Sequence, residues 1–156
     1  MEIGATKAVQ DRLKTTKIEE SKGASLVFCW DTHLTKIKGR NVLFIVNASN
    51  RYTIAMTDIE PRNWNYYTMY IRSVIHGVMQ EMGYSEDQIG QYFKMSGDTT
   101  VTKTHGRKSV GGINRMVMDA QYFGKKLEKE AKYQWELSEY LNRDICQPEG
   151  FDAYGY

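Results

Sequence analysis

The stretch that decides the fold is Ser25–Thr57, SLVFCWDTHLTKIKGRNVLFIVNASNRYTIAMT. Val42–Val46 is a continuous apolar run, which is typical of a strand buried on both faces. Arg51–Met56 alternates polar and apolar side chains and predicts a half-buried strand, and Ser25–Trp30 predicts another. Because turn-prone polar residues separate these runs, we expect an antiparallel sheet of about three strands here.

Two further strands are predicted on either side of this stretch. Glu2–Ala5 is short and fits an edge strand, and Thr99–Thr104 fits a strand that follows a Ser-Gly-Asp turn. Between them, a helix is predicted from Trp64 to Met82, because its apolar residues recur at helical spacing and Gly83 ends the pattern. A second, short helix follows, and its start carries a capping box formed by Ser85 and Gln88.

The last helix is predicted to be long. Ser109 is its expected N-cap, and an apolar stripe continues for about thirty residues, which is unusual for a domain of this size. The fold class is therefore α+β, with an antiparallel sheet of about four or five strands, about four helices and a long C-terminal helix. We expect an α+β domain over residues 1–123, a charged helical extension over 124–145 and a mobile tail over 146–156.

Composition bounds the class of protein. The chain has 156 residues, 41% of them hydrophobic, which suits one globular domain with a sizeable core. Cys29 and Cys146 lie far apart and form no CxxC pair, so we predict no disulfide framework, no metal site and no cofactor. The sequence shows no signal-peptide pattern and no apolar run of membrane-spanning length, so we expect a cytoplasmic protein without membrane contact.

Charge is distributed unevenly along the chain. Residues 1–118 hold 16 basic and 11 acidic side chains, whereas residues 119–156 hold 5 and 8. From Thr99 to Met118 there are four Lys or Arg and no Asp or Glu. A basic body of this kind fits anion binding, although solvated helix faces give the same pattern.

The junction between the predicted strand at 99–104 and the last helix is the strongest functional signal. A helix start offers free backbone N–H groups and favours negative charge, and an Arg or Lys beside it suits phosphate oxygens. We therefore predict a phosphate-binding site here. The alternative is a capped helix that follows a basic, solvated loop and binds no ligand. The residues expected to contact the ligand are Lys103, Arg107, Lys108 and Ser109, with Arg115 at the rim.

Thr6 and Lys7 repeat this pattern at another predicted helix start. If the strand at Glu2–Ala5 pairs beside the strand at Thr99–Thr104, both helix starts could face one ligand. Two unrelated strand ends are the alternative.

Several motifs, in order, resemble those of an uncharacterised bacterial family, a domain of unknown function. They are Gly4-Ala5-Thr6-Lys7, the run Val42–Tyr52 and Thr102–Val110. Members carry "GCTK", "VND.NRY" and "TKTxxRxSV" segments. They often stand ahead of a plasmid-encoded open-reading-frame domain. In this chain we expect the charged helix and the tail instead of that second domain. The resemblance implies an α+β module and no mechanism. Ala5 stands where the family has cysteine and Ala48 where it has aspartate, which weakens any thiol or metal chemistry at those two positions.

Other functional classes are supported less well. No zinc-protease or nucleophile-elbow motif occurs, so no catalytic residue is assigned. If the protein is an enzyme, the alternative is hydrolysis of a phosphate ester, with His33 or His105 as the acid–base group. Aromatic residues could stack on the bases of a nucleic acid and basic residues such as Arg51 could contact its phosphates, but no recognised nucleic-acid motif supports this. The best prediction is a non-enzymatic protein, from a bacterium or a phage-type element, that binds a nucleotide or nucleic acid.

The alternative prediction is a protein–protein interaction module, such as a regulator or inhibitor from a mobile element. It would act through the last helix, by docking onto a partner or by forming a homodimer. Trp135 and Leu141 lie on the apolar stripe of that helix and would make the contact. An exposed Trp135 would favour this reading.

Overall fold

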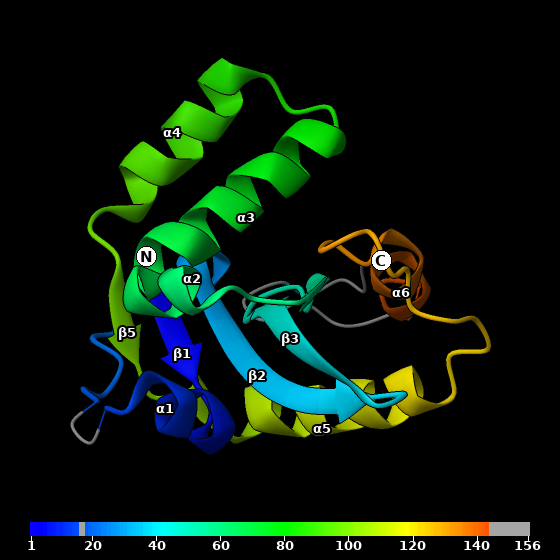
Figure 1. Cartoon of the computed structure of the whole chain (residues 1–156). Coiled ribbons are helices and arrows are strands. Elements are labelled where there is room, and N and C mark those ends of the chain that lie inside the picture. Colours follow the sequence, from blue (N-terminus) through cyan, green and yellow to red (C-terminus); the bar gives the residue numbers. More distant parts are fainter. Residues whose placement is uncertain (16–17, 144–156) are drawn as a thin grey trace.

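The protein is built on one five-stranded sheet with strand order β4-β3-β2-β1-β5 (Figure 1). The computed structural model describes residues 1–15 and 18–143. The strands are β1 (Glu2–Ala5), β2 (Cys29–Ile37), β3 (Arg40–Asn47), β4 (Thr53–Thr57) and β5 (Thr100–Thr102).

Strands β2, β3 and β4 form the antiparallel part of the sheet, as expected. The strand predicted at Ser25–Trp30 begins only at Cys29, because Leu26–Phe28 forms a 3-10 helix. The turn between β2 and β3 consists of Lys38 and Gly39, which both have positive φ angles, of 49° and 82°. Two positive φ values are what a two-residue hairpin turn requires, and glycine adopts them without a steric cost. Val42–Val46 lies inside β3 and is buried throughout.

Strand β1 lies inside the sheet rather than at its edge. It pairs in parallel with β2 on one side and with β5 on the other. The sheet is therefore mixed, and the prediction of a purely antiparallel sheet is wrong. The cause is the connection through α1 (Lys7–Leu13), which returns the chain so that β2 runs alongside β1.

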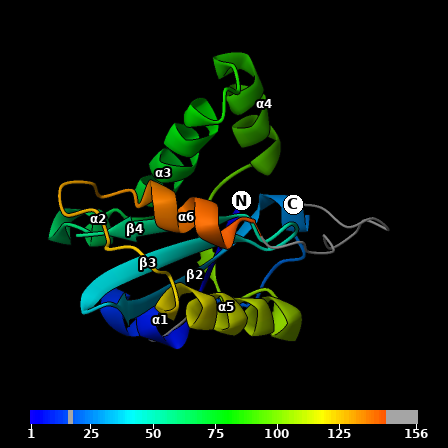
Figure 2. The same cartoon turned by 90° about the vertical axis from the view of Figure 1, so that its right-hand side faces the viewer.

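Helices cover both faces of the sheet. In Figure 2, α3 (Tyr67–Glu81) and α4 (Glu86–Ser96) lie on one side of the sheet and α5 (Gly106–Gln121) lies on the other. Ile71 and Ile75 of α3 pack with Ile3 on the first face, and Ile113 and Met116 of α5 pack with strand residues on the second. The other two α-helices that follow α1 in the described residues are α2 (Pro61–Asn65) and α6 (Trp135–Leu141).

The signals for the two middle helices are confirmed. Gly83 follows α3 with a φ of 87°, a backbone conformation that only glycine adopts easily. Ser85 and Gln88 form the capping box of α4, in which each side chain bonds the other residue's backbone N–H. Tyr66 separates α2 from α3, so one predicted helix is two.

The long C-terminal helix is not present. Helix α5 ends at Gln121, residues 122–134 contain no helix, and the short helix α6 begins at Trp135. The chain instead forms hydrogen bonds along the free edge of β4, including Thr57 N to Lys132 O at 2.7 Å and Gln134 N to Ala55 O at 2.9 Å. These bonds satisfy backbone groups that an edge strand would otherwise expose.

Residues from this C-terminal segment also join the core. Leu127 and Leu137 pack in the same cluster as Phe44 and Ile113. The tail predicted for residues 146–156 and the end of the predicted extension lie outside the described residues. Among the helices of residues 1–15 and 18–143, not one combines the length and apolar character needed to cross a membrane.

Candidate functional site

The start of α5 is capped by a side chain from β2. The backbone N–H of His105 donates to both carboxylate oxygens of Asp31, at 3.2 Å each. A carboxylate is stabilised at a helix N-terminus by the exposed N–H groups and the helix dipole. The expectation that Ser109 caps this helix is wrong, because α5 begins at Gly106 and Ser109 lies within its first turn.

Asp31 has two further partners. The Nδ1 atom of His105 lies 2.6 Å from Oδ1, and the hydroxyl of Ser109 donates to Oδ2. The Asp31 side chain is fully buried and that of His105 is 2% exposed. A buried carboxylate needs several such hydrogen bonds to offset its desolvation, and here each oxygen has at least two partners.

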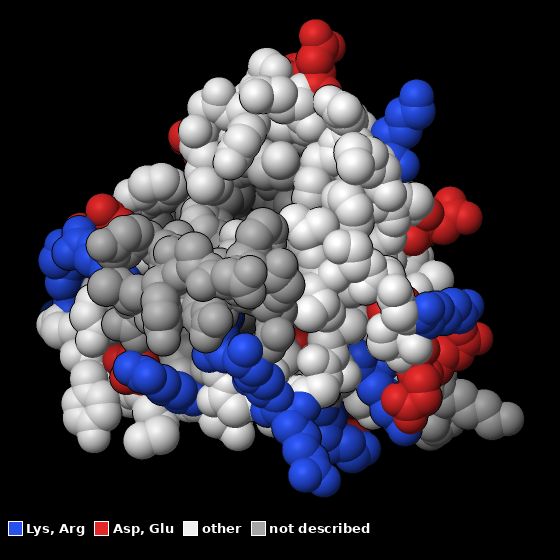
Figure 3. Space-filling view, turned by 180° about the vertical axis from the view of Figure 1, so that it is seen from behind, with Lys and Arg blue, Asp and Glu red and all other residues white. Residues whose placement is uncertain are grey.

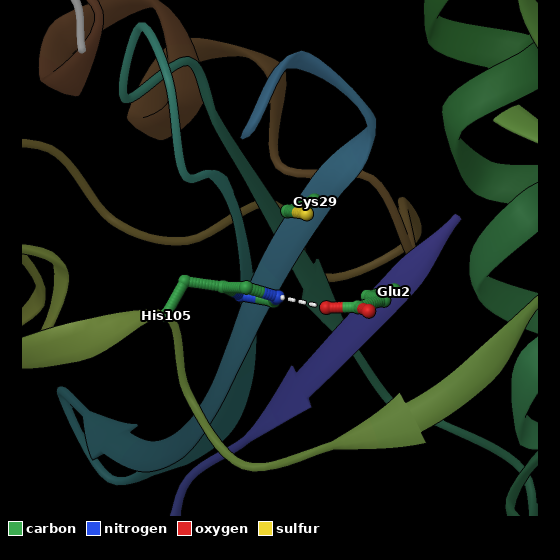
Figure 4. A group of neighbouring side chains, drawn as sticks. All are labelled: Glu2, Cys29 and His105. Atoms are coloured by element: carbon green, nitrogen blue, oxygen red, sulfur yellow. Dashed lines mark hydrogen bonds and ion pairs between the residues drawn. The ribbon is translucent and has the colours of Figure 1, made fainter. Parts of the chain in front are cut away.

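The second nitrogen of His105 contacts another acid. Its Nε2 atom lies 3.0 Å from Oε2 of Glu2, the first residue of β1, as Figure 4 shows. The Glu2 carboxylate also accepts hydrogen bonds from the Ser21 hydroxyl at 2.6 Å and from the Lys22 backbone at 2.8 Å. His105 is therefore held between two buried acidic side chains from neighbouring strands.

The pKa values follow from this arrangement. Burial alone would lower the pKa of His105, but the hydrogen bond to Asp31 and the charge of that carboxylate raise it to about 10. Burial would raise the pKa of Glu2, but hydrogen bonds from Ser21, Lys22 and His105 bring it below its ordinary value. His105 is thus an imidazolium at neutral pH.

Within the described residues, Glu2, Cys29 and His105 are a set close enough to share a metal ion. Their ligand atoms lie within 4.8 Å of one another. Cys29 is fully buried and lies opposite Glu2 in the register of β1 and β2.

A cavity of about 390 Å³ lies between the β3–β4 connection, α5 and the end of α6. Pockets of roughly 300–1,000 Å³ are typical of small-molecule sites. Its lining combines basic side chains with apolar and hydroxyl-bearing ones. The basic lining residues are Arg51, Lys108, Arg115 and Arg143.

Arg51 is held against the backbone of α5. A Cβ atom on Gly112 would lie 2.7 Å from a terminal nitrogen of the Arg51 guanidinium, so a larger residue there would displace the end of this side chain. Arg51 itself has a φ of 63°, which is uncommon for a residue other than glycine. Arg51 therefore lies against α5 at the wall of the cavity.

The structure brings together some of the predicted ligand residues. Lys108, Ser109 and Arg115 all line the cavity. Arg107 is exposed on the first turn of α5 and is not part of the lining, and Lys103 pairs with Glu20. Figure 3 shows Lys and Arg side chains along the lower part of the rear face, at the level of α5.

Thr6 and Lys7 have local partners. The Thr6 hydroxyl lies 3.1 Å from Nδ1 of His33, and Lys7 pairs with Asp11 one turn along α1. Strands β1 and β5 do pair side by side, as the hypothesis of a shared ligand requires. The structure places neither Thr6 nor Lys7 in the cavity lining.

The residues assigned to a protein interface lie on α6. Leu141 lines the cavity, whereas Trp135 is 45% exposed and packs edge-on against Tyr133.

Reasoning from the sequence missed Glu2 and Arg143, and it considered Arg51 only as a contact for nucleic-acid phosphates. The signal available for Glu2 was an acidic residue within a short strand that is otherwise apolar. The pairing of Asp31 with His105 spans 74 positions of the chain, so spacing could not reveal it.

Comparison with known proteins gives one match. No curated protein and no solved structure matches the chain. A family model covers residues 2–156, which is nearly the whole chain. The chain therefore belongs to the family described as Domain of unknown function (DUF6933).

Proposed function

We propose that this protein binds a small phosphate-bearing ligand, such as a nucleotide, in the cavity beside α5. The observation that carries the proposal is the convergence of four basic side chains from three separate segments on one cavity: Arg51, Lys108, Arg115 and Arg143. Arginine forks and lysine ammonium groups are the side chains that bind phosphate oxygens best.

The rest of the lining suits a ligand with both a charged and an apolar part. Val46, Ile113, Met116 and Leu141 offer apolar surface, and Ser109 and Asn47 offer hydrogen-bonding groups. Within the described lining, Asp119 is the one acidic residue, and its carboxylate lies 3.9 Å from Nε of Arg115. Its carboxylate can accept a hydrogen bond from a sugar hydroxyl, while the cations contact the phosphate.

The experiment is a thermal-shift and calorimetric titration of the full-length chain at low salt. The probes are inorganic phosphate, nucleoside mono- and triphosphates, cyclic dinucleotides and short oligonucleotides. A ligand at a hundred times its dissociation constant adds about 2.7 kcal/mol to the free energy of unfolding. Binding through phosphate contacts weakens steeply as salt is added.

Two double variants with equal loss of charge locate the site. Lys108→Gln with Arg115→Gln removes two cations of the cavity, and we expect the affinity to fall at least about tenfold, one lost charged contact being worth about 1.5–3 kcal/mol. Lys103→Gln with Arg107→Gln removes two cations of the same basic segment that do not line the cavity, so the affinity should stay nearly unchanged. The reverse pattern would place the ligand on the exposed junction, and no binding of any probe by the parent protein would overturn the proposal.

One observation favours the alternative of a protein interface. Trp135 is 45% exposed, although the rest of α6 packs on β4 through the buried Leu137 and Ser138. If Trp135 mediates a contact between copies, Trp135→Glu should lower the mass measured in solution by light scattering. An unchanged mass would show that α6 serves its own domain.

A further inference from the structure

We propose that Glu2, Cys29 and His105 together bind one zinc ion, at a site buried between β1, β2 and the start of α5 (Figure 4). This site is separate from the cavity proposed for the phosphate-bearing ligand, since none of the three residues lines that cavity.

The donor set fits zinc. A thiolate, an imidazole and a carboxylate are the three protein ligand types that zinc uses, whereas magnesium and calcium prefer oxygen ligands alone. The ligand atoms lie within 4.8 Å of one another. Zinc–ligand bonds of about 2.0–2.3 Å in a tetrahedron place ligand atoms roughly 3.5 Å apart, so a closure of about 1 Å brings the three ligand atoms to bonding distance of one ion.

The scaffold holds the ligands at fixed positions. Glu2 and Cys29 are direct neighbours in the parallel register of β1 and β2. His105 follows β5, which pairs with the other side of β1. Two neighbouring strands therefore position Glu2 and Cys29, and the N-cap position of α5 places His105 beside them.

A second carboxylate orients the imidazole. Asp31 lies 2.6 Å from Nδ1 of His105, on the side of the ring away from Glu2. Zinc-bound histidines almost always donate their other ring N–H to a carboxylate or carbonyl group, which fixes the tautomer. Here Asp31 leaves Nε2 directed toward Glu2, where the ion would lie. Coordination through Oε2 of Glu2 leaves Oε1 bonded to the Lys22 backbone.

The cluster of Glu2, Asp31 and His105 is shielded from water. The buried cluster contains two acidic side chains and one imidazolium, and all three side chains are at most 5% exposed. When zinc binds, His105 loses its Nε2 proton and Cys29 loses its thiol proton, so two protons pass to the buffer for each ion bound.

The first test is metal binding by tag-free, full-length protein that has been dialysed against a chelator. Equilibrium dialysis with zinc, followed by elemental analysis, should give one ion per chain. Cobalt, which takes the same tetrahedral geometry, should give the charge-transfer absorption of a cobalt–thiolate bond. A parent protein that binds no zinc, or a cobalt complex without thiolate absorption, would refute the site.

Matched variants assign the ligands. Cys29→Ser should abolish the thiolate absorption and His105→Gln should abolish binding, whereas Cys146→Ser and His76→Gln should retain both. His76 is the natural control because it lies near the surface and also contacts an acid, Glu86. Asp31→Asn should weaken zinc binding about 10–100-fold, as loss of an outer carboxylate does.

Folding is checked separately, because the cluster is buried. If Cys29→Ser and His105→Gln both fail to fold, the Cys146→Ser protein still decides the question. Its only thiol is Cys29, so retained cobalt–thiolate absorption identifies Cys29 as a ligand and lost absorption excludes it.

Discussion

A Cβ atom added to Gly4 would lie 1.8 Å from Oδ1 of Asp31. The two residues are register partners on β1 and β2, and the Asp31 carboxylate occupies the space that any other residue at position 4 would need. The backbone of Thr104 lies 3.0 Å from the same point, so the chain has no room to adjust on that side.

Gly4→Ala should therefore destabilise the protein strongly. Inserting a methyl group into a packed interior costs about 1–3 kcal/mol, and here it also displaces the carboxylate that caps α5. Chemical denaturation should show the loss in the free energy of unfolding. Gly77→Ala in α3 is the control: its Cβ would meet nothing within 4 Å, so this change should stabilise the protein by about 0.5–1 kcal/mol. A Gly4→Ala protein of parental stability would show that Asp31 is free to move.

Asp31→Asn tests the buried ion pair. The amide keeps the size of the side chain but leaves the His105 imidazolium next to a neutral group, and breaking a buried pair in this way costs about 3–5 kcal/mol. Denaturation should be measured with a chelator present, so that bound metal does not contribute. Asp11→Asn removes an exposed acid paired with Lys7 and should change stability by less than about 1 kcal/mol. Equal effects of the two variants would contradict the importance assigned to the buried pair.

Ser138→Ala tests how α6 protects the edge of the sheet. The Ser138 hydroxyl accepts a hydrogen bond from the buried backbone N–H of Ala55 at 3.0 Å. An unsatisfied buried donor costs about 1–3 kcal/mol, and the Ala55 amide should exchange with deuterium faster. Glu139→Ala, at an exposed position one residue further along α6, should leave both quantities close to the parental values.

The stability should also depend on pH through His33. Burial lowers the pKa of this histidine below its ordinary value of 6.5. Between the folded and unfolded pKa values the unfolded chain binds more protons, so stability is fully present above pH 6.5 and declines as the pH falls below it. A His33→Gln protein should lose less stability than the parent over this range, and an NMR titration of the ring gives the pKa directly. Parallel pH profiles for the two proteins would contradict the assignment.

Local sequence patterns predicted the parts of the fold that depend on neighbouring residues. The alternation in Arg51–Met56 and the apolar run in Val42–Val46 identify β4 and β3, and the capping box identifies the start of α4. The position of β1 inside the sheet could not be predicted in this way, because it depends on pairing with β5 about one hundred residues later.

The C-terminal prediction failed because two kinds of interaction compete there. Leu127, Ala131 and Trp135 recur at helical spacing, yet the backbone of this segment bonds to β4 instead. The spacing of apolar residues shows that the segment could form a helix, but it carries no information about hydrogen bonds to a distant strand. Similarly, the basic segment indicated Lys108, Ser109 and Arg115 correctly as neighbours, but Arg51 and Arg143 join them through tertiary packing alone.

The central position of β1 has a consequence for synthesis of the chain. Its residues leave the ribosome before those of the other four strands, and β2 can pair with them once Cys29–Ile37 has followed. The other edge of β1 stays unpaired until β5 emerges, near residue 100. During that interval the nascent protein exposes the unpaired edge of β1, and Glu2 and Asp31 lack their partner His105, which has not yet been made. Such edges invite association between chains, so a pause in translation before residue 100 should promote aggregation.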